Sequence, residues 1–372
     1  MRRKHLLLLG GLICLDVALP IWAAANPLFI EQYYSQGFYP LLSGFLRFLF
    51  GWLHFSVAEL ILLLCVFAGL YMLYRLFKEL SRLTSPDDVP GWLLSCLFRG
   101  VTVFVTIHLA FVVCWGLNYY RLPLGDALGL TILPAEKQEL LDLAREMADI
   151  VNNEREMIAE DTDGVASLGA SPRYWLSVSW DDVTGAHPGV PIFRHAPYYQ
   201  RAKPVLLSSL MSYTHITGFF FPFTGESNIN MNTPVFELPA TISHELAHHL
   251  GIAREDEANY VSWRHSRSKH APPEVRYSGS LRAFVYVLNA SYNIATPEEY
   301  ANLWALLSDA VLRDLAASRE FWDRYRGRVQ TISEQVNDTY LKSNQQADGV
   351  QSYGRMVDLL LAERRVQGKL NP

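Results

Sequence analysis

The sequence predicts a mainly helical α+β protein in which N-terminal transmembrane helices precede one soluble domain with a small β-sheet. Half of the 372 residues are hydrophobic, which is high for a purely soluble chain. Charged residues are few in the first 120 residues and frequent afterwards, and the longest apolar stretches all lie in that first part. We therefore divide the chain into a membrane region at 1–120 and a second domain at 121–372.

Three apolar stretches, at about residues 5–25, 52–74 and 100–120, are long enough to cross a bilayer, which takes roughly 20 apolar residues. The first has a second interpretation. Basic residues at 2–4 and the run of alanines at 23–25 also fit a cleavable signal peptide. Lys and Arg residues gather before the first stretch and between the second and third, so we expect a multi-pass protein of the cell membrane whose domain is extracytoplasmic.

Each predicted span carries one ionisable residue, namely Asp16, Glu59 and His108. Such groups are costly in hydrocarbon and usually face the interior of a helix bundle. We expect them to form hydrogen bonds that hold the spans together. A proton or ion path is the alternative.

After residue 120, periodicity and turn signals predict mostly helices. Apolar residues at three- and four-residue spacing predict a helix at 134–157, and alternating aromatic and β-branched residues predict a strand at 173–180. A Gly-, Pro- and His-rich composition predicts a loop at 181–203. The other predicted helices lie at 206–213, 234–250 (ending at Gly251), 254 onward, 281–294, 297–327, 329–344 and 350–366.

A β-hairpin is predicted at residues 218–232. Thr224-Gly225 is typical of a turn between its two arms. In the second arm, from 228 to 232, three asparagines alternate with Ile229 and Met231, so that arm is expected to have one polar and one apolar face.

The run His244-Glu245-Leu246-Ala247-His248 carries the strongest chemical signal. Residues four apart lie on one face of a helix, so two imidazoles can bind one Zn²⁺ from consecutive turns. Glu245 can then act as general base on a water whose pKa the zinc lowers. An ordinary amphipathic helix with two polar histidines is the alternative, but the run sits on a predicted helix directly after a predicted strand.

A catalytic zinc needs a third protein ligand, and the acidic segment Glu255-Asp256-Glu257-Ala258-Asn259 comes next. Glu-x-x-Ala-Asn resembles the glutamate helix of gluzincins. The resemblance implies that Glu255 is the third ligand and that Asn259 orients a ligand histidine from the second shell. Glu257 and Asp256 stay as alternatives for the ligand.

The connection between the two segments departs from that resemblance. Only six residues separate His248 from Glu255, fewer than gluzincins usually have. Metzincins have such a short link through a glycine, but their third histidine corresponds here to Arg254, which cannot bind zinc. A left-handed turn at Gly251 can still bring the following carboxylate back to the metal.

The whole layout resembles a domain-of-unknown-function family of bacterial membrane proteins with about three N-terminal spans and HELAH and EDEAN segments. Residues 221–226, 337–342 and 352–355 also match it. The resemblance covers nearly the whole chain and implies a gluzincin-like, zincin-like metallopeptidase domain. Because peptides commonly pair with an edge strand in zincins, residues 228–232 are a candidate substrate wall.

Several residues are candidates to complete the site. Tyr353, Arg355, His215 and His265 could stabilise the oxyanion, although a structural role is the default for each. His249 points about 100° away from its neighbour around the helix, which predicts a second-shell or surface position.

The sequence therefore predicts a membrane-anchored zinc metallopeptidase that hydrolyses peptide bonds with Glu245 as general base. Its expected partners are Zn²⁺, a peptide or protein substrate and the lipid bilayer. No basic tract indicates nucleic acid. The alternatives are a catalytically silent zinc-binding sensor or scaffold, which would not need Glu245, and a zinc amidase acting on cell-wall material.

Two further expectations concern the domain after residue 120. All four cysteines lie in the apolar first third, so this domain has neither a disulfide framework nor a cysteine metal site. The segment 181–203 precedes the site in the chain and could cover it as a self-inhibiting loop.

Overall fold

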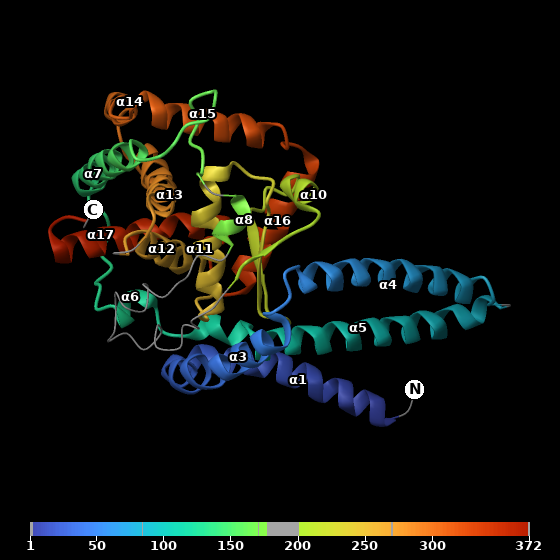
Figure 1. The fold of residues 1–372 in the computed structure, drawn as a ribbon. Helices are drawn as coiled ribbons and strands as arrows, with labels where there is room; N and C mark the ends of the chain where they lie inside the picture. The colour runs from blue at the N-terminus through green and yellow to red at the C-terminus, as the bar shows by residue number, and fades with distance from the viewer. Residues whose placement is uncertain (1–2, 84, 170, 177–200, 269–270, 371–372) are drawn as a thin grey trace.

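The computed structural model describes residues 3–83, 85–169, 171–176, 201–268 and 271–370. Figure 1 shows long helices that extend to one side and a compact group of shorter helices around a small sheet on the other. The predicted α+β organisation, mainly helical with apolar N-terminal helices, is confirmed at this level.

Three of the described helices, α1 (Arg3–Ala25), α4 (Val57–Leu80) and α5 (Val89–Cys114), are long and apolar enough to cross a membrane. They indicate membrane association. Both ends of the second and of the third differ from the prediction, since α4 also runs on to Leu80 and α5 already begins at Val89. The second begins after Ser56, whose hydroxyl caps the helix by accepting the N–H of Glu59. The third ends at Cys114, and Gly116–Tyr120 form a separate, mostly buried 3₁₀-helix, η3.

The segment between the first two spans is helical throughout, which the sequence analysis did not predict. A short helix α2 (Pro27–Phe29) leads into a π-helix η1 (Ile30–Phe38) and then α3 (Tyr39–Phe50). Buried side chains from η1 and α3 pack on the end of α5, where Tyr39 and Trp115 lie with ring centroids 5.7 Å apart. Residues before 120 thus contact the domain that follows, and the division at 120 stays a prediction.

Only two of the three ionisable span residues meet each other. His108 Nδ1 lies 2.7 Å from Asp16 Oδ1, which joins α5 to α1 as expected. Glu59 bonds elsewhere. Its carboxylate accepts the backbone N–H groups of Leu206 and Leu207, both at 2.8 Å, so it ties the first turn of α4 to the following domain rather than to another span.

The helical part of the domain is built on α7 (Lys137–Arg155), which packs along α13 (Pro273–Tyr292). The apolar positions predicted for α7 are buried, which confirms that helix. The expected helix 297–327 is divided, because Ser308 caps a new helix by accepting the N–H of Val311. Other helices of the domain are α6 (Leu124–Ala127), α14 (Pro297–Ala305), α15 (Asp309–Asp323), α16 (Arg328–Ser343), the 3₁₀-helix η6 (Gly349–Arg355) and α17 (Met356–Gln367).

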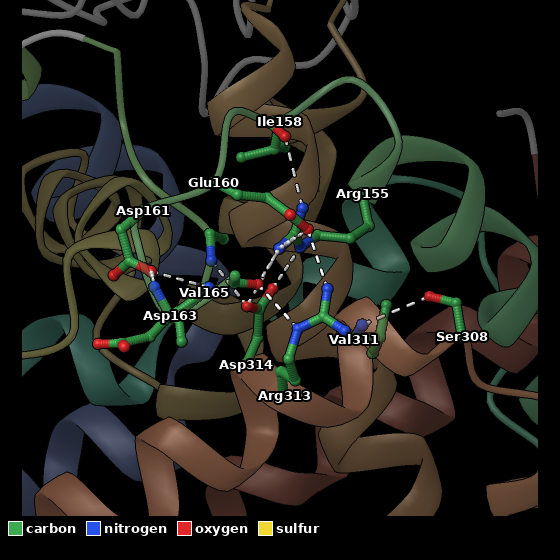
Figure 2. Close-up of polar contacts among 12 residues, drawn as sticks. Arg155, Ile158, Glu160, Asp161, Asp163, Val165, Ser308, Val311, Arg313 and Asp314 are labelled. Atoms are coloured by element: carbon green, nitrogen blue, oxygen red, sulfur yellow. Dashed lines mark hydrogen bonds and ion pairs between the residues drawn. The ribbon is translucent and has the colours of Figure 1, made fainter.

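A buried ion pair joins α7 to α15. Figure 2 shows Arg155 at its centre: the guanidinium Nε lies 2.6 Å from Asp314 Oδ2. The second oxygen of Asp314 accepts the N–H of Ala166 at 2.8 Å, and Arg155 also donates to the carbonyl of Gly164 at 3.1 Å. These bonds compensate both buried charges and fix the loop that follows α7.

The sheet has three short strands, β1 (Lys203–Pro204), β2 (Gly218–Phe221) and β3 (Glu226–Ile229), in the order β1-β3-β2. β1 runs parallel and β2 antiparallel to β3. The hairpin and its turn are confirmed, with Gly225 at φ +65°. The expectation of an edge position for residues 228–232 is wrong, because β3 is central and buried on both faces. Among the described strands, β1 and β2 are the two edge strands, one on each side of β3.

Two predictions before the hairpin have different outcomes. The short helix is confirmed as α10 (Ser208–Ser212). The strand at 173–180 is wrong where the structure describes it, because residues 172–175 form a helical turn, α8 (Pro172–Trp175). Pro172 in its first turn favours a helix start over the short aromatic alternation. Residues 177–200, which include most of the predicted loop and covering segment, lie outside the described residues.

Candidate metal centre

Two consecutive helices, α11 (Leu238–His249) and α12 (Glu255–Ser266), build the site, as predicted. A 3₁₀ turn, η5 (Val235–Glu237), leads into α11. α11 ends where Gly251 takes φ +78°, a left-handed conformation that glycine adopts without steric cost. The N–H of Gly251 donates to the carbonyl of His248 at 2.9 Å. This turn reverses the chain, so that the first residue of α12 faces the last turns of α11.

The three predicted ligands converge. Oε2 of Glu255 lies 3.0 Å from Nε2 of His244 and 3.5 Å from Nε2 of His248. One ligand atom from each residue lies within 4.8 Å of the other two, and all three residues are buried. Zinc bonds of 2.0–2.1 Å in tetrahedral geometry put neighbouring ligand atoms about 3.3 Å apart. The donor types and their spacing therefore fit a zinc ion.

Hydrogen bonding presents His248 in a suitable tautomer. Its Nδ1 donates to the carbonyl of Ile252 at 2.7 Å, which leaves Nε2 to face the cluster. Burial lowers the pKa of His248, but Glu255 outweighs that effect and raises it to about 9, so a metal that binds at Nε2 displaces a proton. Nδ1 of His244 is buried and has no partner among the described residues. Burial raises the pKa of Glu255, but the two histidines outweigh that effect and bring it to about 2. The cluster thus offers a carboxylate that stays charged at neutral pH.

Glu245 lies beside this cluster and is itself buried. Burial raises its pKa to about 8, and Oε2 has no hydrogen-bond partner among the described residues. The other oxygen approaches β2 so closely that a Cβ atom at Gly218 would lie 2.7 Å from it. Only a glycine leaves room for the carboxylate at this point of the strand.

These side chains open into a cavity of about 210 Å³. The edge strand β2 forms one wall through Gly218 and Phe220, and another is formed by Trp115, which precedes η3, and by Tyr119 within it. The ring of Trp115 lies 6.0 Å from that of His248. Because Trp115 directly follows Cys114, the last residue of a candidate span, the cavity lies next to the end of that candidate span.

Tyrosines from η6 and α16 complete the wall. The ring of Tyr353 stacks on that of His244 with 6.3 Å between centroids, and its hydroxyl lies 3.5 Å from Nδ2 of Asn337. The hydroxyls of Tyr340 and Tyr119 are 3.0 Å apart. Burial raises the pKa of Tyr353 well above its usual value and that of Tyr340 to about 12, so both hydroxyls keep their protons.

The second-shell and alternative ligand candidates from α12 bond elsewhere. The amide of Asn259 donates to the carbonyl of Tyr353 at 3.1 Å, so it holds a wall of the cavity rather than a ligand histidine. Glu257 accepts the N–H of Leu124 at 2.8 Å and pairs with Arg254 at 2.9 Å. It therefore anchors α6, and the structure does not bring it to the cluster.

The other candidates lie away from the cavity. Arg355 is exposed and pairs with Asp348 at 2.6 Å. His215 lies against Trp322, with ring centroids 5.2 Å apart, and His265 Nδ1 lies 2.8 Å from Ser243 Oγ. His249 is buried rather than at the surface, and it lines a second cavity.

Apart from Tyr353, sequence reasoning missed the aromatic walls of the cavity. Trp115 and Tyr119 were hidden inside the third apolar stretch, and Phe220 was one residue of an apolar hairpin arm. Tyr340 lies in the segment 337–342 that matched the family resemblance, which was the one available signal for it.

Comparison with known proteins places the chain in a protein family. A family model described as "Protein of unknown function (DUF3810)" matches residues 34–361. No curated protein and no solved structure matches the chain. The matched range contains α4, α5 and the whole His-His-Glu cluster, so two of the candidate membrane helices and the cluster lie within the match to one family.

Proposed function

The chain belongs to the family described as protein of unknown function (DUF3810), and from its site we propose a membrane-anchored zinc peptidase with a zincin-like domain. One observation carries the proposal. His244, His248 and Glu255 converge within 4.8 Å, and the unpartnered carboxylate oxygen of Glu245 lies in the same cavity. A silent zinc-binding sensor would have no use for that buried carboxylate.

Zinc held by this set would supply a Lewis acid and lower the pKa of a coordinated water. The two Nε2 atoms and Oε2 of Glu255 are the atoms that would hold it. The bond from His248 Nδ1 to Ile252 supports this role, because a second-shell acceptor fixes the ring and raises its basicity.

The protein's own groups carry the proton transfers. Glu245 accepts the proton of the attacking water and returns it to the leaving amine, and a general base is most effective when its pKa lies near the operating pH. Burial raises the pKa of Glu245 to about 8, and the positive charge of His248 opposes that increase. A tyrosine hydroxyl, from Tyr353 or Tyr340, donates to the carbonyl oxygen as negative charge develops there.

The edge strand supports a peptide as substrate. β2 is hydrogen-bonded to β3 on one side, and its residues line the cavity. An extended peptide can add to such an edge through main-chain hydrogen bonds. A cell-wall amide remains the alternative substrate. The edge strand β2 beside the candidate metal centre favours a peptide.

The membrane anchor and the side of the domain belong to the same proposal. Three apolar helices support the anchor, and the distribution of Lys and Arg supports an extracytoplasmic domain.

The test uses the full chain, purified in a mild detergent and offered a mixture of denatured proteins, with new peptide ends read by mass spectrometry. We expect cleavage by the parent protein, loss of cleavage on chelation, recovery with added zinc, and a fall of about 10²-fold or more in Glu245→Gln. Undiminished cleavage by Glu245→Gln, or none by a zinc-loaded parent protein, would remove the proposal.

A further inference from the structure

A second cavity, of about 230 Å³, lies at the turn of the hairpin, whose strand β2 lines the candidate metal centre. Its walls come from the loop that joins α3 to α4, from the hairpin turn at 224–226 and from the end of α11. Five basic or imidazole side chains line it, and we name this set the basic cavity: Arg47, His54, Arg201, Lys203 and His249.

The positive charges of the basic cavity are only partly compensated. Glu226 is the one acidic residue in its described lining, and it forms a buried ion pair with Lys203. The same carboxylate accepts the N–H of Ala58 at 2.7 Å and the hydroxyl of Thr224 at 2.8 Å. Glu226 is therefore fully engaged by the lysine and by its neighbours.

Two arginines are left without an acidic partner among the described residues. Arg47 forms no ion pair there, and Arg201 contacts only Nε2 of His54, at 3.4 Å. Two guanidinium groups that converge on one cavity repel each other unless an anion lies between them. The planar fork of arginine matches the oxygens of a phosphate group.

A buried, unpartnered polar atom points to the same ligand. His249 is 8% exposed and its Nε2 has no hydrogen-bond partner among the described residues. A Cβ atom built on Gly225, which also lines the cavity, would lie 4.0 Å from that nitrogen. The imidazole thus faces the hairpin turn, where it can bond to a ligand oxygen.

The position of the cavity suggests where the ligand comes from. Its loop ends at Ser56, directly before α4, and the carboxylate of Glu226 holds the first backbone N–H groups of that candidate span. Trp52, also in the lining, is 70% exposed, as is usual for an aromatic residue at a membrane surface. The phosphates of a bilayer lie at this level of a spanning helix.

We propose that the basic cavity binds a phosphate group, supplied by the headgroup of an anionic phospholipid. Arg47 and Arg201 hold its oxygens, and His249 provides a further polar contact from the hairpin side. The bound headgroup clamps the loop between α3 and α4 onto the hairpin. This site is separate from the candidate metal centre and does not depend on peptidase activity.

The experiment measures thermal unfolding of the full chain in a neutral detergent with three additions: phosphatidylglycerol, inorganic phosphate and diacylglycerol, which lacks phosphate. The test protein is a double variant that carries both Arg47→Gln and Arg201→Gln. Arg326→Gln, an exposed arginine outside the cavity, is the matched control. Each protein is compared with its own unfolding temperature without additive, so that a change in basal stability does not mimic loss of binding.

We expect phosphatidylglycerol to raise the unfolding temperature of the parent protein and of the control, and to act on the double variant only at tenfold or higher concentration. Equal stabilisation by inorganic phosphate would support the site and identify free phosphate as its ligand. Three outcomes would each overturn the proposal. Diacylglycerol could stabilise the parent protein as much as phosphatidylglycerol does, phosphatidylglycerol could fail to stabilise the parent protein, or the double variant could respond to phosphatidylglycerol as the parent protein does.

Discussion

Nε2 of His244 lies 3.0 Å from Oε2 of Glu255, although the two residues are 11 positions apart and belong to different helices. The left-handed turn at Gly251 makes this contact possible. A buried carboxylate that meets two imidazoles in this way is either a structural ion pair or a metal site, and metal content distinguishes them.

We predict that the purified full chain binds about one zinc ion per molecule and that His244→Ala and Glu255→Ala lose it, because a catalytic zinc site has three protein ligands. Metal analysis after dialysis measures this. Glu257→Gln is the control, since Glu257 bonds to Leu124 and Arg254 instead, and it should keep the metal. Equal metal in the parent and in both ligand variants would contradict the assignment.

Gly218→Ala should impair catalysis without removing zinc. The added Cβ would lie 2.6 Å from Cγ of Glu245, so the side chain has to move away from its position beside the cluster. We expect a fall in kcat of at least tenfold, because misplacing a catalytic group by about 1 Å can cost about 10²-fold. Gly100→Ala, whose Cβ would meet nothing within 4 Å, is the matched control. Full activity of Gly218→Ala with bound zinc would argue against Glu245 as the base.

Tyr353→Phe should lower kcat by roughly 10²- to 10³-fold with little change in KM, as loss of one oxyanion donor does. The phenylalanine ring can still stack on His244, so metal content should stay the same. Tyr340→Phe provides the comparison, since its hydroxyl already bonds to Tyr119. If only the Tyr340 variant loses activity, Tyr340 takes the donor role.

Local patterns predicted the elements that bring the candidate ligands together. The spacing of His244 and His248, the glycine after α11 and the start of α12 are all short-range features, so they could be read from the sequence. The three apolar helices also follow from composition over a window of about 20 residues.

Long-range packing decided the features that the sequence did not predict. The third apolar helix ends at Cys114, and the next residue, Trp115, packs on Phe220 with ring centroids 4.7 Å apart. A hydropathy window contains no information about such a contact between distant residues. The alternation in β3 indicated one polar face, but the domain covers both faces. Asn259 was assigned to a histidine from its motif alone, and its amide bonds to Tyr353 because η6 packs on α12.

A further prediction concerns the attachment of η1, which follows the first candidate span, to the turn beside the candidate metal centre. Arg121 is 2% exposed, forms a two-bond ion pair with Glu31 in η1, and donates to the carbonyl of Gly251 at 3.0 Å. Removing one partner of a buried pair leaves the other charge uncompensated, at a typical cost of about 3–5 kcal/mol. We expect Arg121→Met to lower the unfolding temperature in detergent strongly, and Arg121→Met with Glu31→Gln to cost less than the two single changes added together.

The same pair predicts a pH dependence. Burial raises the pKa of Glu31, but Arg121 outweighs this effect, so the pKa in the folded protein lies below its usual value. A carboxyl group with a lowered folded-state pKa stabilises the protein above its unfolded-state pKa and loses that contribution as the pH falls through the folded-state value. The stability difference between the parent protein and Glu31→Gln should therefore be full at pH 7 and shrink below about pH 4. A difference that stays constant from pH 7 to pH 3 would show that the Glu31 carboxylate does not hold η1 against Arg121 through its charge.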